Sequence, residues 1–257
     1  MTLPGSISID ILPIEDIFAE ISAISPDLRG SQSEINSRVK AEIPFWAMVC
    51  GGTRIQACLC GIVKRAMDIT VSSVLMVVLA PLLLLVAAAV KLTTPGAALF
   101  QQTRVGLNGN TFSMYKFRTM AEGAEASQGL LAGQNEAGNI LFKIRNDPRI
   151  TELGRIMRRT SLDELPQLFN VLMGEMSLVG PRPAVPGEVA RYTPKMLQRL
   201  FVKPGMTGIW QVSGRSEIPH LRAFALDIWY ANKWSVVLDL AILINTIPAV
   251  LSRRGAF

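Results

Sequence analysis

The chain has 257 residues, enough for one compact domain with an additional segment. Hydrophobic residues make up 49% of it and the mean hydropathy is +0.33, a composition typical of membrane contact. Residues 1–60 carry four Lys or Arg against seven Asp or Glu, so the net charge of +6 comes from the remainder. A basic, apolar remainder favours anionic lipid and phosphate partners. Because its charges are spread over several motifs, we do not expect it to bind nucleic acid.

Cysteine and histidine usage excludes several classes of site. The odd set of Cys50, Cys58 and Cys60 lacks the Cys-x-x-Cys spacing of a metal site, and we interpret these residues as reduced thiols. The only histidine is His220, which excludes the His-Glu-x-x-His zinc site of metalloproteases. A Ser-His-Asp triad would depend on this residue, which we place in a surface loop. Zinc and serine-hydrolase chemistry are therefore not supported.

Residues 1–60 have a weak structural signal. Residues 1–40 are acidic and contain three prolines, and only residues 11–24 have the pattern of a short amphipathic helix. The N-terminus lacks the basic stretch and apolar core of a secretory signal. Residues 43–62 are moderately apolar but include Arg54 and a Gly-Gly pair, which predicts at most an interfacial segment. We predict a partly disordered accessory extension over residues 1–60.

The strongest hydrophobic run follows a charged motif. Lys64, Arg65 and Asp68 precede residues 69–90, which contain no charged side chain. A straight helix of this length would measure about 33 Å, long enough to cross the hydrocarbon core. However, Pro81 removes a backbone hydrogen bond in the middle, and basic residues flank both ends, so neither orientation is favoured. A kinked span and a re-entrant helix that enters and leaves by one face both fit this pattern.

Two strands are predicted next, at residues 97–104 and 111–118. They are joined by Asn108-Gly109, a dipeptide typical of hairpin turns. The second strand ends in a basic stretch with Lys116 and Arg118, which from the pattern alone would form a solvated face. We therefore predict a small β-hairpin that carries two cations at its end.

A loop, a turn and a short helix follow the hairpin. Residues 121–140 have little periodicity, which predicts a mobile loop or a frayed helix. Asn146-Asp147-Pro148 predicts a turn, in which the Asp147 side chain accepts hydrogen bonds from the backbone rather than binding a metal. Residues 151–159 predict a short basic helix.

A further helix is predicted to begin at two adjacent carboxylates, Asp163 and Glu164. Ser161 with Glu164 three residues later is a capping-box pattern, and Pro166 suits a first helical turn. The apolar residues at helical spacing would bury one face: Leu165, Leu168, Phe169 and Leu172. Acidic residues in a first turn also interact favourably with the helix dipole, so a purely structural role is the alternative to a catalytic one.

Cations bracket the acidic pair. Arg158 precedes it, and Arg182 follows it between Pro181 and Pro183. Arginines together with the free N–H groups of a helix N-terminus form an anion site, in which a carboxylate is costly unless a metal or a reaction uses it. Carboxylates can be covalent nucleophiles toward phosphoryl groups. The two prolines restrict the backbone on both sides of Arg182 and so place it at low entropic cost.

The region after this motif predicts helices and close backbone packing. Residues 185–200 have a helical pattern in which Arg191, Lys195 and Arg199 are expected to be exposed. The glycines of residues 203–214 allow close approach of two backbone segments.

Two C-terminal helices are predicted, at residues 227–234 and 236–251, and the second is almost entirely apolar. Trp229, Tyr230 and Trp234 suit a membrane-interface belt. We expect both helices to lie along the bilayer surface.

Two long motifs resemble those of the bacterial sugar transferase family, the monotopic polyprenyl-phosphate phosphoglycosyl transferases. They are Ser-Leu-Asp-Glu-Leu-Pro-Gln-Leu at residues 161–168 and Ser-Leu-Val-Gly-Pro-Arg-Pro at residues 177–183. The resemblance runs from about Val63 to the C-terminus. It implies a helix broken at Pro81 that dips into one leaflet of the bacterial inner membrane, with the catalytic part facing the cytoplasm. Many members have Ser before this proline, where this chain has Ala80.

The resemblance also implies a reaction. A UDP-sugar donates its sugar-1-phosphate to undecaprenyl or another polyprenyl phosphate, giving UMP and a polyprenyl-diphosphate-sugar. This is the first step of exopolysaccharide, capsule or O-antigen synthesis. Asp163 is implied as the covalent nucleophile and as a ligand of Mg²⁺ or Mn²⁺, with Glu164 as the second catalytic residue. The residues expected to bind substrate phosphates are Lys116, Arg118, Arg158 and Arg182.

The predicted fold is α+β, mostly helical and membrane-associated, with a proline-broken re-entrant helix, a small β-hairpin and amphipathic interfacial helices. Three parts are predicted: the extension 1–60, the membrane helix 61–92 and a catalytic domain 93–257. A homodimer is one of the oligomeric states left open. Two other functions compete with the transferase: a membrane-anchored phosphatase acting on lipid diphosphates, and a non-catalytic scaffold of a polysaccharide assembly complex. No pattern selects the sugar.

Overall fold

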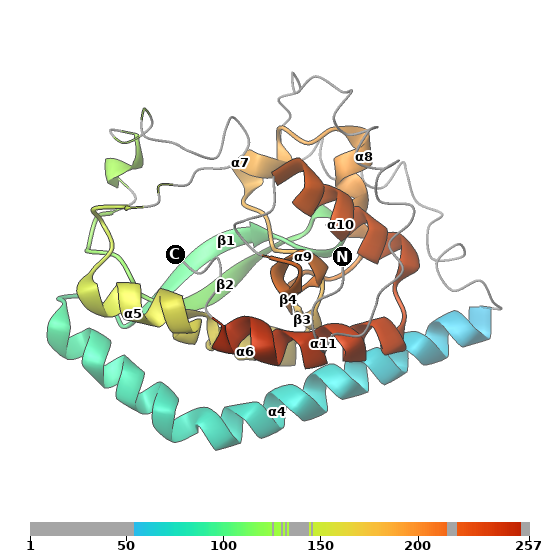
Figure 1. The fold of residues 1–257 in the computed structure, drawn as a ribbon, viewed down its shortest axis with the longest axis horizontal. Helices are drawn as coiled ribbons and strands as arrows, with labels where there is room; N and C mark the ends of the chain where they lie inside the picture. The colour runs from blue at the N-terminus through green and yellow to red at the C-terminus, as the bar shows by residue number, and fades with distance from the viewer. Residues whose placement is uncertain are drawn as a thin grey trace.

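The computed structural model describes residues 54–124, 126–129, 131, 133, 144, 146–214 and 220–252 (Figure 1). The predicted extension lies outside the described residues up to residue 53, as does part of the predicted loop 121–140. The longer helices are α4 (Arg54–Thr93), α5 (Glu152–Thr160), α6 (Gln167–Met173), α10 (His220–Lys233) and α11 (Val236–Leu251). The one-turn helices are α7 (Pro186–Val189), α8 (Pro194–Leu197) and α9 (Ile209–Val212). The 3₁₀ turns are η1 (Leu107–Gly109), η2 (Ala126–Gln128), η4 (Leu162–Glu164) and η5 (Gln198–Phe201). The strands are β1 (Leu99–Val105), β2 (Thr111–Phe117), β3 (Ser177–Val179) and β4 (Gly205–Thr207).

The longest element, α4, runs along one side of the molecule and changes direction in its middle (Figure 1). It is continuous over 40 residues with Pro81 inside it, so the predicted break takes the form of a bend within one helix. Pro81 cannot donate to the carbonyl of Val77, and this lost bond is the physical cause of such a bend. Among the described helices, α4 alone is long and apolar enough to cross a membrane, and only 11% of its most apolar stretch is buried in the protein.

The part of α4 before Pro81, its first arm, is attached to the rest of the protein by polar side chains. The guanidinium of Arg65 donates to the main-chain oxygens of Val171 at 2.6 Å and Leu172 at 2.7 Å, at the C-terminal end of α6. Asp68 is buried and accepts a hydrogen bond of 3.0 Å from the backbone N–H of Leu178 in β3. The predicted membrane-helix residues therefore join α4 to two elements of the domain.

The part of α4 after Pro81, its second arm, contacts the same domain through apolar side chains. Val86 and Val90 are buried in a small cluster with Phe117 at the end of β2 and Met157 of α5. Both arms of the helix are thus attached to one folded body, and the apolar stretch between them is largely exposed.

The predicted hairpin is confirmed. Strands β1 and β2 pair antiparallel, in a register that runs from Leu99 opposite Phe117 to Val105 opposite Thr111. The turn has Asn108 at φ 55° and Gly109 at φ 80°, the left-handed region that these two residue types tolerate best.

The predicted close approach of glycines is also confirmed. Strands β3 and β4 pair in parallel, and the backbone N–H of Gly180 donates to the carbonyl of Thr207 at 2.9 Å. A Cβ atom on Gly180 or on Gly205 would collide with the backbone of the opposite segment. This packing brings the segment that contains Arg182 against the loop that follows η5.

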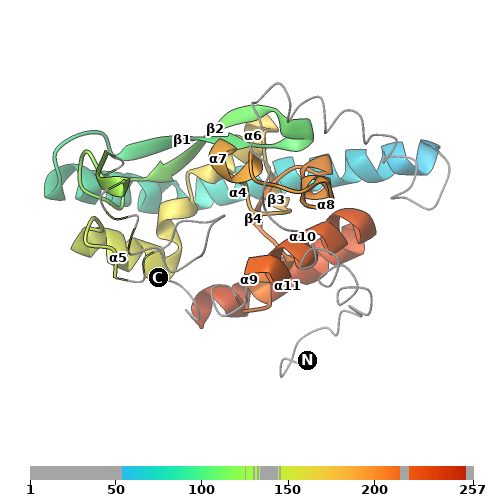
Figure 2. The same cartoon turned by 90° about the horizontal axis from the view of Figure 1, so that it is seen from above.

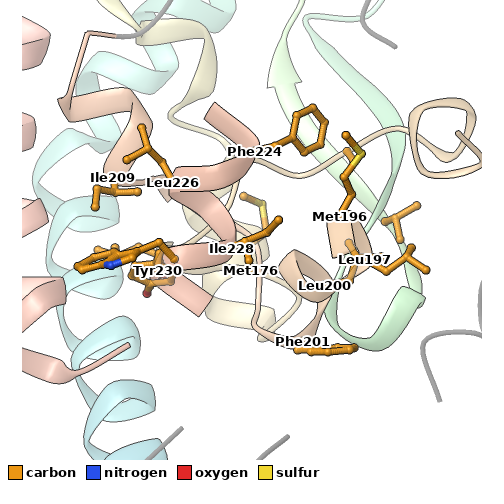
Figure 3. Close-up of a cluster of buried hydrophobic side chains, with 14 of the residues drawn as sticks. Met176, Met196, Leu197, Leu200, Phe201, Ile209, Phe224, Leu226, Ile228 and Tyr230 are labelled. Carbon is orange, nitrogen blue, oxygen red and sulfur yellow. Dashed lines mark hydrogen bonds between the residues drawn. The ribbon is translucent and has the colours of Figure 1, made fainter. Parts of the chain in front are cut away.

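The main core joins α10 to the segment of α8 and η5 (Figure 3). Trp229 is 6% exposed and Tyr230 is 1% exposed, so the prediction that they form a membrane-interface belt is wrong. The reason is that α10 begins at His220 and packs inside the domain as a helix of 14 residues, where its aromatic rings fill the core. Both views place α5 at one end of the molecule and α10 toward the other (Figure 2).

An exposed apolar row follows one side of α11. Val237, Leu240, Ile244, Ile247 and Leu251 recur at helical spacing, and each is at least 47% exposed. Its opposite side packs into the core. This division of faces is the one expected of a helix that lies along an apolar surface.

The polar side of α11 holds α4 through a buried charge. The carboxylate of Asp239 is fully buried and lies 2.6 Å from the Lys64 ammonium, which is 15% exposed. Asp239 also accepts hydrogen bonds from the Tyr230 hydroxyl at 2.7 Å and the Trp234 indole at 3.1 Å. A buried carboxylate with a matched cation and two further donors is well compensated.

We expect Lys64→Met to destabilise the protein, because it leaves the Asp239 carboxylate buried without its counter-ion. Removing one partner of a buried pair costs about 3–5 kcal/mol. The lower of these values corresponds to a fall in Tm of roughly 6–12 °C for a protein of this size. Thermal unfolding in detergent measures this change. The control is Lys91→Met at the exposed end of the same helix. Equal Tm values for the two variants would contradict the role assigned to the Lys64–Asp239 pair.

Candidate active site

The acidic pair lies in a 3₁₀ turn rather than at the start of an α-helix. Ser161 ends α5 in the left-handed conformation, φ 58°, and its side chain makes no capping hydrogen bond. The predicted capping box is therefore wrong, because a residue that closes one helix is not in the extended conformation that a helix N-cap needs. Asp163 and Glu164 occupy η4, and α6 begins after Pro166.

Helix α6 is aligned with β2 by a buried amide that the sequence analysis did not single out. The Asn170 side chain donates to the carbonyl of Ser113 at 2.7 Å and accepts from the N–H of Tyr115 at 3.0 Å. Leu168 is buried as predicted, but Phe169 is 46% exposed. Compared with the face predicted from the apolar residues, the buried face of α6 is rotated so that Asn170 faces the hairpin. The reason is that β2 offers backbone hydrogen-bond partners on that side.

This alignment places Lys116 of β2 beside the acidic pair. Its ammonium lies 2.9 Å from the Glu164 carboxylate. Burial opposes ionisation of Glu164, but the charge and hydrogen bond of Lys116, together with the charges of Arg182 and Arg104, lower the pKa of Glu164. Lys116 and Glu164 thus form a charged pair at one edge of the site.

Asp163 has a different environment. It is only 7% exposed, and burial, with the added repulsion of Glu164, raises the pKa of Asp163 to about 6. The nearby charges of Lys116 and Arg158 act in the opposite direction and keep the pKa from rising further. Asp163 is therefore a carboxylate with reduced solvation that still ionises near neutral pH.

Arg158 is oriented by the packing of α5. Its Nε donates to the hydroxyl of Thr119 at 3.0 Å. Gly154 of the same helix lies so close to Thr119 that a Cβ atom would collide with the Thr119 backbone. The glycine thus allows α5 to approach the end of β2 and brings Arg158 within electrostatic reach of Asp163.

The other predicted cations have different positions. Arg182 is partly exposed and lies 3.7 Å from the carboxylate of Glu188, and its charge also acts on Glu164. Arg118 donates to the carbonyls of Thr94 and Pro95 in the turn after α4. Within the described residues, no hydrogen bond or ion pair joins Arg118 to either carboxylate of the pair.

Asp147 has the turn role predicted for it. Its carboxylate accepts the backbone N–H of Arg149 at 3.0 Å and forms an ion pair with the Arg149 guanidinium at 2.6 Å. The side-chain hydrogen bond from Arg149 outweighs the effect of burial and lowers the pKa of Asp147.

Sequence reasoning missed two arginines near Arg182. Arg104 of β1 is buried, and burial lowers its pKa to about 10. Arg199 was expected to be exposed, and this is wrong: it is 6% exposed and forms an ion pair with buried Asp227. The helical pattern did not indicate this burial, because the elements that cover Arg199 come from other parts of the chain.

The metal ligands available to this site are few. The described residues contain no group of three or more His, Cys, Asp or Glu side chains that could hold a metal ion. The site offers the adjacent carboxylates of Asp163 and Glu164. One or two carboxylates fit Mg²⁺ when substrate phosphates and water supply the other ligands, which is the usual arrangement for this ion.

We expect Asp163→Asn to stabilise the protein at pH 8. The pKa of Asp163 is 3.8 in the unfolded chain and about 6 in the folded protein, so the fold loses stability as pH rises through this interval. Asparagine removes that loss, which is worth about 1–3 kcal/mol above pH 6. Thermal unfolding should show a higher Tm for the variant at pH 8 and a smaller difference at pH 4.5. A gain that did not depend on pH, or one also seen for exposed Glu152→Gln, would contradict the assignment.

Comparison with known proteins places this site in a family. A model described as bacterial sugar transferase matches residues 59–253. An uncharacterized sugar transferase of Haemophilus influenzae is 49% identical over 200 residues, which cover 76% of this chain and 42% of the relative. The undecaprenyl-phosphate galactose phosphotransferase of Salmonella typhimurium is 45% identical over 199 residues, 76% of this chain and 41% of the relative. The UDP-glucose:undecaprenyl-phosphate glucose-1-phosphate transferase of Caulobacter vibrioides is 41% identical over 205 residues, 76% of this chain and 72% of the relative.

The chain spans about two fifths of the length of the first two relatives and about seven tenths of the third. The matched region includes most of α4, the hairpin, the acidic pair and the segment around Arg182. The match covers well over half of the chain, and the chain therefore belongs to the bacterial sugar transferase family.

Proposed function

We propose that this protein transfers a sugar-1-phosphate from a UDP-sugar to a polyprenyl phosphate, through a covalent phosphosugar on Asp163. The observation that carries this proposal is a buried carboxylate between cations: Asp163, with Lys116 and Arg158 close enough to act on its pKa. Such a site attracts a diphosphate and presents a nucleophile to it. The names of the Salmonella and Caulobacter relatives support undecaprenyl phosphate as the acceptor.

The reaction takes place in two displacements. In the first, a carboxylate oxygen of Asp163 attacks the phosphorus that carries the sugar, and the bond from this phosphorus to the bridging oxygen breaks. UMP leaves with that oxygen and the bonding electrons. In the second, a phosphate oxygen of the polyprenyl phosphate attacks the same phosphorus. The bond to Asp163 breaks, and the product is a polyprenyl-diphosphate-sugar with the carboxylate regenerated.

Reduced solvation makes Asp163 suited to this role. A fully hydrated carboxylate would have to lose its water before it reached phosphorus, and burial removes most of that water in advance. The raised pKa also makes the carboxylate a stronger nucleophile than an ordinary aspartate. At pH 7 and above it remains largely ionised, because its pKa is about 6.

The cations neutralise charge that the attacking carboxylate would otherwise meet. Lys116, Arg158 and Arg182 surround the acidic pair and supply donors for the non-bridging phosphate oxygens. Glu164 has a separate role: its ion pair with Lys116 holds that ammonium in place. Arg118 supports the turn after α4, and its contact with the substrate phosphates stays a prediction.

Mg²⁺, or Mn²⁺ in its place, would be held by Asp163 together with the substrate diphosphate. When bound, the ion withdraws charge from the phosphate oxygens and stabilises the departing UMP. The protein carboxylate would contribute a minority of its ligands, as the donor set of this site requires.

The attachment of α4 supports a re-entrant position in the membrane. A helix that crossed the bilayer would place its two ends on opposite faces, about 30 Å apart. Here Arg65 in the first arm and Val90 in the second both contact the same domain. We infer that the bent helix dips into one leaflet, with the domain and the row of α11 at the cytoplasmic surface of the inner membrane. There the acceptor phosphate lies at headgroup level.

The alternatives make different products. A phosphatase acting on lipid diphosphates would release inorganic phosphate, and a non-catalytic scaffold would release nothing. A scaffold would also have no use for the buried charge of Asp163, which destabilises the fold at neutral pH. The transferase is therefore the function that the site supports best.

We expect solubilised protein with Mg²⁺, undecaprenyl phosphate and the correct UDP-sugar to release UMP, and Asp163→Asn to lower the rate by at least about 10³-fold because the nucleophile is removed. A panel of UDP-sugars identifies the donor, and Glu152→Gln is the matched control.

The same assay across pH adds an independent check. The wild-type rate should fall about tenfold per unit below pH 6, because protonation removes the nucleophile as pH falls through the pKa of Asp163. Substantial turnover by Asp163→Asn would exclude the covalent mechanism, and release of inorganic phosphate would favour the phosphatase.

We expect cysteines at the two ends of α4 to be labelled from the same face of the membrane. Val63 is 49% exposed and Leu92 is 86% exposed, and each is replaced by cysteine in a chain whose native cysteines are serine. A membrane-impermeant maleimide should label both sites from the cytoplasmic side, as it labels a cysteine at exposed Arg191. Pro81→Leu restores the missing backbone donor and should separate the two sites. If the two cysteines were labelled from opposite faces of the membrane while Pro81 is present, α4 would cross the bilayer.

A further inference from the structure

The loop that carries Arg182 is held from behind by two buried arginines. The main-chain oxygen of Arg182 accepts a hydrogen bond of 3.0 Å from the Arg199 guanidinium. The next main-chain oxygen, that of Pro183, accepts one of 2.7 Å from the Arg104 guanidinium. Charged donors make the stronger class of hydrogen bond, so two consecutive carbonyls are fixed at a single turn of the chain.

Main-chain bonds continue this attachment on both sides. The carbonyl of Pro181 accepts the N–H of Gly205 at 2.8 Å, and that of Ala184 accepts the N–H of Val105 at 2.8 Å. Four consecutive carbonyls are therefore bound. The backbone of the loop is anchored to both β1 and the loop after η5.

Burial of the Arg104 guanidinium has a free-energy cost that a purely structural role would not require. It is 7% exposed, and among the described residues its Nε has no hydrogen-bond partner. The described ion pairs do not include it, and the charges of Glu188 and Glu164 favour its cationic form only from beyond ion-pair distance. Its other hydrogen bond goes to the neutral amide of Gln102 at 2.5 Å. Burying a cation without a directly paired anion is unfavourable, whereas an apolar side chain could fill the same space.

Arg199 is itself held rigidly. It forms an ion pair with Asp227 and donates to the Tyr192 hydroxyl at 2.8 Å. Its guanidinium carbon lies 4.6 Å from the centre of the Phe224 ring. A guanidinium bound on several sides is a fixed donor for the carbonyl of Arg182.

The Arg182 side chain, in contrast, is free to meet a ligand. It is 40% exposed, and its contact with Glu188 is long, at 3.7 Å. Its backbone is restricted by a proline on each side and by the bound carbonyls. The cation is thus placed by its main chain, and its guanidinium keeps donors available for phosphate.

We propose that Arg104 and Arg199 are positioning residues that fix the carbonyls of Arg182 and Pro183 and so place the Arg182 guanidinium for the substrate diphosphate. The chemical purpose of this arrangement rests on the proposed function, but the arrangement itself can be tested by binding alone. Preorganisation of this kind reduces the entropy that binding and reaction must overcome.

The test is a double-mutant cycle on anion binding. Inorganic diphosphate with Mg²⁺ is titrated by calorimetry into the full-length protein and into Arg182→Ala, Arg104→Lys and the double variant. We expect Arg104→Lys to raise the Kd about tenfold, because lysine keeps the charge but cannot reproduce the planar guanidinium geometry. In the Arg182→Ala background the same change should raise it less than about twofold, since it acts through Arg182.

Several results would overturn the proposal. Effects that multiply in the double variant would mean that Arg104 acts independently of Arg182, and an unchanged Kd for Arg104→Lys would mean that it does not act on the anion at all. Failure of the wild-type protein to bind diphosphate would remove the anion site that the pair arranges. Arg191→Lys, an exposed change in the same region, is the control. Thermal unfolding of each variant separates misfolding from loss of position.

UMP release separates this proposal from the proposed function. Arg104→Lys should lower kcat more than it changes KM, because the placement of Arg182 matters most when charge moves in the transition state. Arg199→Lys should do the same provided that its Tm shows a folded protein. Diphosphate binding with a non-additive cycle but no UMP from any UDP-sugar would support the positioning pair and reject the transferase. UMP release with an additive cycle would do the reverse.

Discussion

Three charged side chains at the start of α4 determine how the apolar helix sits against the domain. Lys64 pairs with Asp239 of α11, Arg65 binds the last carbonyls of α6, and Asp68 binds the backbone of β3. Each of these groups is partly or fully buried, so the contacts are lost only at a substantial cost in free energy. Without them, the helix would be held against the domain by apolar contacts such as those of Val86 and Val90.

The same anchors reach the acidic pair and the loop of Arg182. Strand β3, which receives Asp68, leads directly into the loop that carries Arg182. Helix α6, which receives Arg65, follows the turn with Asp163 and is aligned with β2 through Asn170. The position of α4 and the geometry of the acidic pair are therefore parts of one network.

The two neighbouring carboxylates of the site have different electrostatic environments. Glu164 forms an ion pair with Lys116, and its pKa is lowered although burial acts in the opposite direction. Asp163 is buried, and its pKa rises to about 6. Adjacent residues of the same chemistry thus differ in protonation and in role, because one side chain meets an ammonium and the other meets the interior.

Periodic and local signals were the reliable part of the sequence analysis. The hairpin around Asn108-Gly109, the basic helix before the acidic pair and the apolar helix at residues 236–251 were predicted and are present. The failures share a cause. The local pattern predicts a helix start at Ser161 and surface positions for Tyr230 and Arg199, because a single segment does not reveal what packs against it.

The sequence by itself determined the membrane-directed composition, the apolar run interrupted by Pro81, and the resemblance that assigns a role to Asp163. These properties follow from residue type, spacing and motif, which are local. Only the tertiary structure decided that both arms of α4 meet one domain, that Lys116 reaches Glu164, and that two buried arginines bind the loop of Arg182. The arginine contacts join residues up to 79 positions apart in the chain, so their energies depend on burial and geometry that no local pattern contains.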